Sequence, residues 1–455
     1  MRSLELHSVA DPRAPQPRRQ QPLNRRIASL FHFSRSRRTL TLVDQAIVSG
    51  SNFITGVILV RGLGLVEFGR FTIAYAILLL ANSIQLSFIS SPMITLGSLC
   101  ATPEERRRFV RGIFGVQIIF CAIASVLAVA GTAVYIAIRA SAGAHAGATD
   151  FMLPFASAVV AFLMQDWLRR YYFTVGKASA SLWNDAISYI GQVIILCPLW
   201  WTHCLTINTA LWSIAATSGA AFAIGAVLER LGCTRGETRE AWRQSHAISI
   251  DLGISNQLQW LVYQGAMLIG AGVVGPQAAG GVRATQNIIG PVNVAYQAME
   301  NIVPVRAAEE MKRGGIERVS AFLFRFGAIG FAALLVFFLT AALFSRQFLS
   351  FFYGPQLHAY AAVLDLQMLY FLLTWPIRQV SFLFRTIRST RPILIASILA
   401  AIISLVLVYP AVRAFGAIGI MLAAVAAQIA NLACLIVSWF RMSSLRPELF
   451  EAQPE

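Results

Sequence analysis

Long apolar stretches with few charged residues recur along the whole chain, and this pattern constrains the fold more than any other feature of the sequence. A helix needs about 20 consecutive apolar residues to cross the hydrocarbon core of a bilayer. Charged residues make up only 13% of the 455 residues and hydrophobic residues 57%, whereas a typical soluble domain carries roughly 25% charge. Membrane-spanning strands would instead give segments of about ten residues with alternating polarity. We therefore expect an all-α polytopic membrane protein.

Twelve of these stretches are long enough to cross a membrane, and we predict one spanning helix for each. The division between the fifth and sixth spans depends on the short polar turn Trp201-Thr202-His203. Ahead of the first span, residues 1–39 are polar and rich in arginine, which predicts a disordered basic arm and not a cleaved signal peptide. The predicted spans are residues 40–60, 71–97, 112–138, 151–168, 181–200, 205–228, 248–274, 280–304, 319–345, 361–384, 392–412 and 416–440.

The distribution of basic residues predicts how the chain is oriented. Cytoplasmic loops of membrane proteins carry an excess of Lys and Arg. With the N-terminus in the cytoplasm, 29 of the 37 Lys and Arg residues fall on the cytoplasmic side, five fall outside and three lie within spans. We therefore expect a multi-pass protein of the bacterial inner membrane with both termini in the cytoplasm. The same rule explains the net charge of +16, so no nucleic-acid partner is expected.

A weak internal repeat divides the spans into two sets of six. The turn after the first span holds Gly64-x4-Gly69, and the turn after the seventh span holds Gly275-x4-Gly280, 211 residues later. Repeats of this kind build many transporters, in which two lobes rock against each other. The predicted parts after the arm are an N-terminal lobe (residues 40–228), a cytoplasmic linker (229–247), a C-terminal lobe (248–440) and a cytoplasmic tail (441–455).

Polar faces on the spanning helices predict a central cavity. Lipid cannot satisfy polar side chains, so such faces point to protein or to water. The first span carries Asn52 within a polar sector, and the seventh carries Gln259. For the first span, hydrogen bonding between packed helices remains an alternative to cavity lining. The eighth span has a continuous polar stripe at three- and four-residue steps: Arg283, Gln286, Asn287, Gly290, Asn293, Gln297, Glu300, Asn301 and Pro304.

Three arginines within spans are candidates for binding an anionic substrate: Arg283, Arg325 and Arg378. Charges inside a membrane are costly and usually functional, and a guanidinium group can grip phosphate oxygens through two parallel hydrogen bonds. Arg325 and Arg378 lie at similar depth from the cytoplasm, so both could serve a cavity open to that side. Alternatively, these side chains extend to the membrane surface or pair with Asp365 or Glu300.

Four acidic residues are candidates for coupling transport to a proton or another cation: Asp44, Asp185, Asp251 and Glu300. A buried carboxyl group can exchange a proton during a transport cycle. Asp44 and Asp251 also begin their helices, where an acidic side chain complements the helix dipole, so a purely structural role stays open for both. Asp166, at helical spacing from Arg169 and Arg170, is expected to form a local ion pair.

Other kinds of site are not indicated. The six cysteines and six histidines are scattered without the spacing of metal ligands, so no metal site is expected. No nucleotide-binding lysine motif is present, and no cofactor is expected. Because the predicted loops are short, they leave no room for a catalytic site, and the chain is not expected to be an enzyme.

The turn after the first span carries a motif. It reads Arg61-Gly62-Leu63-Gly64-Leu65-Val66-Glu67-Phe68-Gly69-Arg70-Phe71. An Arg, then Leu-Gly, then Glu-Phe-Gly and an aromatic residue make it similar to the start of bacterial polysaccharide flippases, including the O-antigen flippases. These belong to the multidrug/oligosaccharidyl-lipid/polysaccharide exporter superfamily. A second similarity is the segment Leu349–Tyr353 followed by Gly354, which resembles the aromatic-Gly turn of that family.

The resemblance implies two six-helix bundles in a V shape around a central cavity. It also implies the transfer of undecaprenyl-diphosphate-linked oligosaccharides across the inner membrane for O-antigen, capsule or exopolysaccharide synthesis. The implied partners are this lipid-linked substrate, membrane lipids, and a polysaccharide polymerase with its chain-length proteins. The main alternative is a proton- or cation-coupled multidrug exporter of the same superfamily. Such exporters usually place an acidic residue late in the first helix, whereas Gly56–Val60 contains none.

Overall fold

The protein is built of long helices, and the part of the chain that the structure describes contains no β-strand. The computed structural model describes residues 23–100, 102–141, 148–387 and 389–445. The first half contains α1 (Leu23–Gln85), η1 (Leu86–Ser90), α2 (Ser91–Leu99), α3 (Pro103–Ser141), α4 (Ala148–Val175), α5 (Ala178–Asp185), η2 (Ala186–Ile190), α6 (Gly191–Trp201) and α7 (Ile207–Glu229). The second half contains α8 (Arg235–Trp260), η3 (Leu261–Gly265), α9 (Ala266–Val274), α10 (Pro276–Leu343), α11 (Ser345–Tyr353), η4 (Pro355–Tyr360), α12 (Ala361–Thr386), α13 (Arg391–Phe415) and α14 (Ala417–Leu445).

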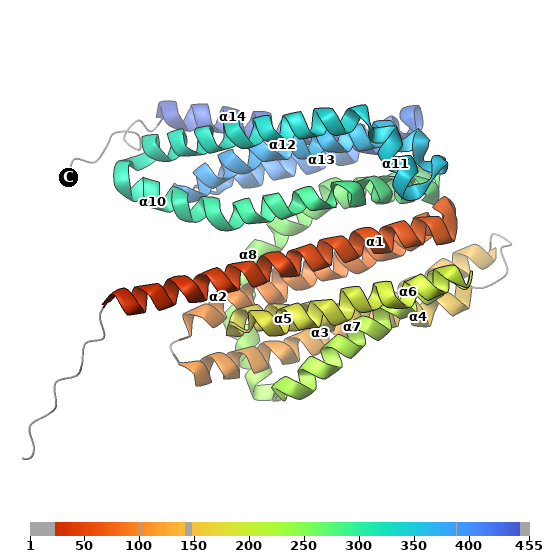
Figure 1. The fold of residues 1–455 in the computed structure, drawn as a ribbon, viewed down its shortest axis with the longest axis horizontal. Helices are drawn as coiled ribbons and strands as arrows, with labels where there is room; N and C mark the ends of the chain where they lie inside the picture. Colours follow the sequence, from red (N-terminus) through yellow and green to blue (C-terminus); the bar gives the residue numbers. More distant parts are fainter. Residues whose placement is uncertain (1–22, 101, 142–147, 388, 446–455) are drawn as a thin grey trace, which may run out of the picture.

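The helices lie in two groups, as Figure 1 shows. Helices α1–α7 form one group and α10–α14 form the other, while α8 passes from the first group to the second. The groups meet mainly where α1 runs alongside α10. The expected all-α membrane fold is therefore confirmed, and the two sets of helices correspond to the two halves of the chain.

The helices account for the expected membrane crossings. Among the described residues, nine helices are long and apolar enough to span a membrane. The first of these, Val43–Gly97, folds back at Gly64, where the backbone is non-helical, and so contains two crossings. The predicted spans at 248–274 and 280–304 lie on α8–α9 and on the first limb of α10, where polar side chains lower the hydropathy. Each of the twelve predicted spans thus falls on a helical limb.

The two glycine turns have the same conformation and pack against each other. Gly64 has φ 75° and ψ 167°, and Gly275 has φ 112° and ψ 167°. Only glycine adopts such values readily. A methyl group on Gly69 would lie 2.0 Å from the carbonyl oxygen of Pro276, and one on Gly280 would lie 2.9 Å from that of Leu65. Gly64 and Gly275 are 211 residues apart, and so are Gly69 and Gly280. Equivalent residues of the two halves therefore make equivalent contacts. We call this pseudo-twofold contact between the halves the glycine junction.

The first helix begins earlier than predicted. Residues 23–39 were expected to belong to a disordered arm, but α1 extends back to Leu23. The reason is that Leu23, Ile27 and Leu30 recur at helical spacing and that arginine favours helices. Residues 1–22 and 446–455 lie outside the described ranges, and with them lie most of the predicted arm and tail.

The predicted linker is also largely helical. Helix α8 begins at Arg235, after a Thr234 cap whose side chain accepts a hydrogen bond from the Glu237 backbone N–H. Its first turns pack closely against α3, because a methyl group on Gly112 would lie 2.3 Å from the Glu237 carbonyl oxygen. The connection between the two halves is therefore a fixed helix on the first half.

We expect Gly69→Ala to destabilise the protein. The added methyl group would meet the Pro276 carbonyl oxygen at 2.0 Å, and this oxygen belongs to the backbone and cannot rotate away. Overpacking of this kind costs about 1–3 kcal/mol. Gly131→Ala is the matched control, since its methyl group meets nothing within 4 Å. Thermal unfolding of the purified protein in detergent compares the two variants, and an unchanged midpoint for Gly69→Ala would contradict the junction.

Candidate functional site

A polar pocket lies where α1 meets the first limb of α10, near the glycine junction. It contains about 400 Å³ of empty space, part of which is open to solvent. Three helices supply its polar groups, namely α1, α6 and α10. The lining residues are Asn52, Thr55, Gly56, Leu59, Phe68, Phe71, Thr72, Tyr75, Gln192, Arg283 and Asn287.

The polar sectors predicted on the first and eighth spans converge at this pocket. A methyl group on Gly56 would lie 2.1 Å from Nδ2 of Asn287, so glycine at this position lets the two helices approach closely. Asn52 lies one turn before Gly56 on α1, and Arg283 lies one turn before Asn287 on α10. Of the predicted cavity residues, Asn52, Arg283 and Asn287 are thus brought together.

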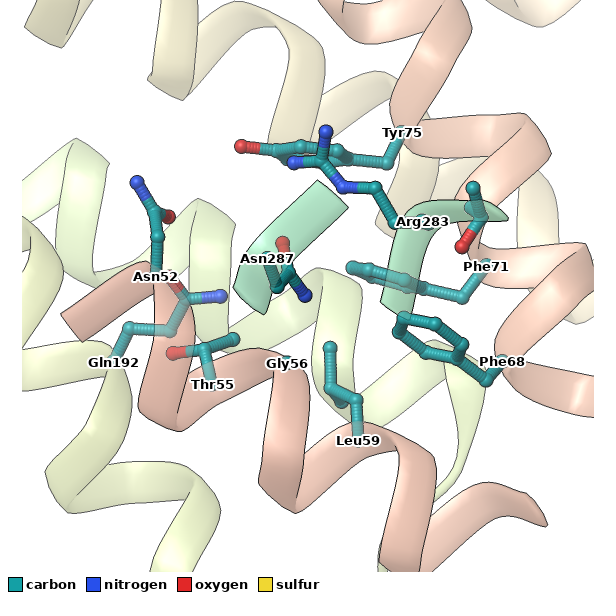
Figure 2. Close-up of a pocket in the computed structure, with 11 residues that line it drawn as sticks. Asn52, Thr55, Gly56, Leu59, Phe68, Phe71, Tyr75, Gln192, Arg283 and Asn287 are labelled. Atoms are coloured by element: carbon teal, nitrogen blue, oxygen red, sulfur yellow. The ribbon is translucent and has the colours of Figure 1, made fainter. Parts of the chain in front are cut away.

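Arg283 is a cation without an acidic partner in the pocket lining. Its Nη1 donates a hydrogen bond to Oε1 of Gln286 at 3.0 Å, and its Cζ lies 5.2 Å from the centroid of the Tyr75 ring. Figure 2 shows the guanidinium along this ring, with the amides of Asn52 and Asn287 nearby. The lining contains no Asp or Glu, and Arg283 forms no ion pair with any described residue. Its charge is therefore available to an anion.

The end of the first limb of α1 is tied to α11. Arg61 donates hydrogen bonds to the carbonyl oxygens of Phe352 at 2.7 Å and Phe351 at 2.5 Å. Carbonyl groups in the last turn of a helix lack partners within it, and Arg61 satisfies two of them on α11. The Phe53 and Phe352 rings pack edge to face at 4.9 Å. The motif arginine therefore ties the first half of the chain to the second.

A second cluster of charged residues is buried within the first half. Arg169 on α4 forms ion pairs with Asp44 at 2.9 Å and with Asp185 at 2.7 Å. The carboxylate side chains are only 2% and 0% exposed and the Arg169 side chain 11%. Two predicted coupling residues, 141 positions apart in the sequence, thus share one guanidinium group. Asp185 lies at the start of the π-helical turn η2, and such turns are frequent at functional sites.

Neighbouring amides extend this cluster. Nε2 of Gln165 donates to Asp185 at 2.9 Å, and Nδ2 of Asn82 donates to Asp166 at 3.0 Å. The predicted local pair between Asp166 and Arg170 is confirmed, at 3.4 Å. The cluster, defined by Asp44, Asp166, Asp185, Arg169 and Arg170, therefore combines three carboxylates with two guanidinium groups.

Arg378 lies elsewhere and already has a partner. It forms an ion pair with Glu300, and Arg385 approaches the same carboxylate at 3.4 Å. The Arg378 guanidinium also lies over the Tyr296 ring, with Cζ 5.6 Å from the centroid. The structure thus shows the pairing with Glu300 that the sequence left open, and Arg378 does not line the pocket.

Arg325 points away from the packed face of its helix. Leu323 and Gly327 on α10 are buried, and the Gly327 carbonyl accepts a hydrogen bond from the Trp375 indole at 2.9 Å. Arg325 lies on the opposite side with Phe324, which is 80% exposed. Arg325 therefore shares no site with Arg283 or Arg378, because depth along a helix does not fix the direction of a side chain.

The remaining predicted residues divide into two sets. Asn293 is exposed and does not line the pocket. The side chains of Gln259, Gln297 and Asp251 lie outside the part of the chain that the structure describes. Conversely, the pocket contains Gln192 and Tyr75, which the sequence analysis missed. Gln192 shares a polar face of the fifth span with Ser181, Asp185 and Ser188, and this pattern could have marked it, whereas Tyr75 has apolar immediate neighbours.

Solved structures show what this arrangement is similar to, although no protein family and no curated protein matches the chain. One is the lipid II flippase MurJ in an inward closed conformation, with a TM-score of 0.66, 13% identity and coverage of 88% of this chain and 87% of that one. Another is a MATE transporter in complex with MaL6, with a TM-score of 0.62, 14% identity and coverage of 91% and 97%. A third is a transporter of the MOP superfamily from Pyrococcus furiosus, whose binding pocket is described as having reverse polarity. Its TM-score is 0.61, with 14% identity and coverage of 91% of this chain and 97% of that one.

The chain shares its fold with these transporters. At 13–14% identity this similarity establishes the fold alone. With the apolar helices described above, it makes the protein a multi-pass membrane protein whose structural neighbours are transporters and flippases, not enzymes.

We expect Arg169→Met to destabilise the first half strongly. The variant leaves the buried carboxylates of Asp44 and Asp185 without a cation, and breaking a buried pair in this way costs about 3–5 kcal/mol. Arg70→Met is the control, because Arg70 pairs with Glu67 on the surface at 2.5 Å and exposed pairs contribute at most about 1 kcal/mol. Thermal unfolding measures both. Equal effects would show that the cluster is not held by Arg169.

Proposed function

We propose that this protein is a flippase that moves undecaprenyl-diphosphate-linked oligosaccharides across the bacterial inner membrane for surface polysaccharide synthesis. The observation that carries the proposal is Arg283, a cation with no acidic partner among the described residues, placed in a polar pocket between the two halves of the chain. The motif at Arg61–Phe71 and the structural similarity to a lipid II flippase support it.

The chemistry of the pocket suits a diphosphate with attached sugars. A guanidinium group binds phosphate oxygens bidentately, and Arg283 is the group we assign to that role. The amides of Asn52, Gln192 and Asn287 offer both donors and acceptors to sugar hydroxyls, and the Tyr75 ring offers an apolar face. The lipid tail would remain in the bilayer while the head group passes through the pocket.

A multidrug exporter of the same superfamily is the second candidate, because MATE transporters share the fold. A pocket for cationic drugs gains from a carboxylate that attracts the charge. The lining residues here include Arg283 and no acidic residue, so the pocket repels a cation. This difference in charge is the reason we favour an anionic substrate.

We further propose that the buried cluster around Arg169 couples transport to a proton or a cation. Three carboxylates face two guanidinium groups, which leaves one negative charge without a partner in a region where isolated charges are costly. Binding one proton or one monovalent cation would neutralise it. Glu300, paired with both Arg378 and Arg385, has no such surplus, and Asp251 remains a candidate on sequence grounds alone.

We expect Arg283→Gln to impair export of lipid-linked sugars. The variant keeps hydrogen-bonding groups but removes the charge that holds the diphosphate, and a hydrogen bond to a charged group contributes about 1.5–3 kcal/mol, or roughly ten- to a hundred-fold in affinity. The measurement is the amount of surface polymer and of undecaprenyl-linked repeats on the cytoplasmic leaflet, at matched protein levels in cells that depend on this gene.

Arg325→Gln is the matched control, since it removes the same charge from the exposed face of α10. Normal export with Arg283→Gln, or equal loss with both variants, would argue against the pocket as the anion site. If surface polymer were normal in a deletion strain that had become sensitive to cationic drugs, the exporter hypothesis would replace the flippase.

We expect Asp185→Asn to uncouple transport from the driving ion. The substitution preserves the size of the side chain and its hydrogen bond with Gln165, but removes the surplus charge of the cluster. Export should then no longer respond to a collapse of the proton or sodium gradient, at matched levels of inserted protein. Asp365→Asn, in a half-buried position on α12, is the comparison, and a retained gradient response in Asp185→Asn would place coupling elsewhere.

A further inference from the structure

The first turns of α8 present a row of cationic and aromatic side chains, which we call the linker row. Its members are Arg235, Arg239, Trp242, Arg243 and His246, all exposed. At 100° per residue these positions share one side of the helix. Trp242 leaves 45% of its surface exposed and lies beside the His246 ring, with centroids 6.5 Å apart.

The opposite side of the helix is fixed to α3, so the linker row cannot turn inward. A methyl group on Gly112 would lie 2.6 Å from Cβ of Ala241, and one on Gly115 would lie 2.0 Å from Oγ1 of Thr238. Ala241 and Ser245 are buried. The exposed row therefore faces away from the bundle as a consequence of packing.

The linker row lies beside the point on α3 where the charged segment ends and the apolar span begins. On α3, the charged segment Arg106–Arg111 ends just before Gly112 and Gly115, and the apolar span begins there. Helix α8 runs across the direction of the neighbouring helices as it passes to the second half of the chain (Figure 1). We therefore expect the first turns of α8 to lie along the membrane surface and not to cross it at this point.

The charge of the row is only partly compensated. Arg243 pairs with Glu240 at 3.5 Å, whereas Glu237 faces Arg111 at 3.7 Å. Neither Arg235 nor Arg239 forms an ion pair with any residue that the structure describes. Two cations at the membrane edge thus remain available for an anionic group outside the protein.

We propose that the linker row binds the head groups of anionic phospholipids. Guanidinium groups match phosphate oxygens in geometry, tryptophan side chains favour the membrane–water boundary, and each arginine near an anionic surface contributes about five-fold to binding. The opposite charge and the level of the row at the edge of the apolar span both favour lipid over a soluble partner. This proposal does not depend on which substrate the transporter carries.

The test compares lipid retention by the full chain in nanodiscs made of an equal mixture of phosphatidylcholine and phosphatidylglycerol. Native mass spectrometry counts the phosphatidylglycerol molecules that stay bound after extraction. The variant Arg235→Gln/Arg239→Gln/Arg243→Gln should lose most of this retention, whereas Arg235→Lys/Arg239→Lys/Arg243→Lys should keep part of it. High salt should weaken retention by the native protein, because exposed charges are screened.

The matched control removes three exposed arginines from the second half of the chain, with Arg306→Gln/Arg318→Gln/Arg391→Gln. Retention close to that of the native protein is the expected result for this control. Equal retention by the linker-row variant and the native protein, or equal loss in both triple variants, would overturn the proposal. Thermal unfolding of each variant, compared with the native protein, ensures that any loss reflects the row and not misfolding.

Discussion

The close approach of two glycine turns is the contact on which the rest of the structure depends. Gly69 lies against the Pro276 backbone and Gly280 against the Leu65 backbone, in positions where any larger residue would force the turns apart. With the turns in contact, the helices that lead away from them, α1 and the first limb of α10, begin side by side. Their polar sectors then face each other, and Gly56 lets Asn287 approach α1. The pocket is therefore a consequence of the glycine junction. The internal repeat in the sequence reflects this junction, because it supplies the glycines of both turns.

Charge is distributed differently in the two places where polar groups are buried. Around Arg169, every carboxylate has a guanidinium or amide partner, so the first half is held by interactions that are expensive to break in a medium of low dielectric. In the pocket, the partners of Arg283 among the described residues are Gln286 and the Tyr75 ring. Neither partner carries a negative charge. An arrangement that orients a cation without neutralising it suits a site that must bind an anion and then release it.

Much of the fold could be predicted from hydrophobic pattern, because a membrane requires long apolar helices and leaves few alternatives. Periodicity also predicted that Asn52, Arg283 and Asn287 line a cavity, since all three lie on polar faces. Periodicity could not predict the direction of the Arg325 side chain. Arg325 lies at a similar depth to Arg378, but its side chain is on the exposed side of α10. Nor could periodicity find the partner of Asp44, because Arg169 lies 125 residues away and such pairing is decided by packing. Gln192 shares a polar face with Asp185 and Ser188, a signal that could have found it, whereas Tyr75 stands between apolar residues.

The two halves are joined by contacts of three kinds. Arg61 donates hydrogen bonds to backbone carbonyls of α11, and the two glycine turns meet through their backbones. Apolar side chains add to these, because Leu59 and Phe68 of α1 belong to the same buried core as Val282 of α10 and Leu349 of α11. Separating the halves would therefore expose apolar area, which is costly. The proposed transport cycle would move one half against the other, and such a movement must rearrange these apolar contacts as well as the turns.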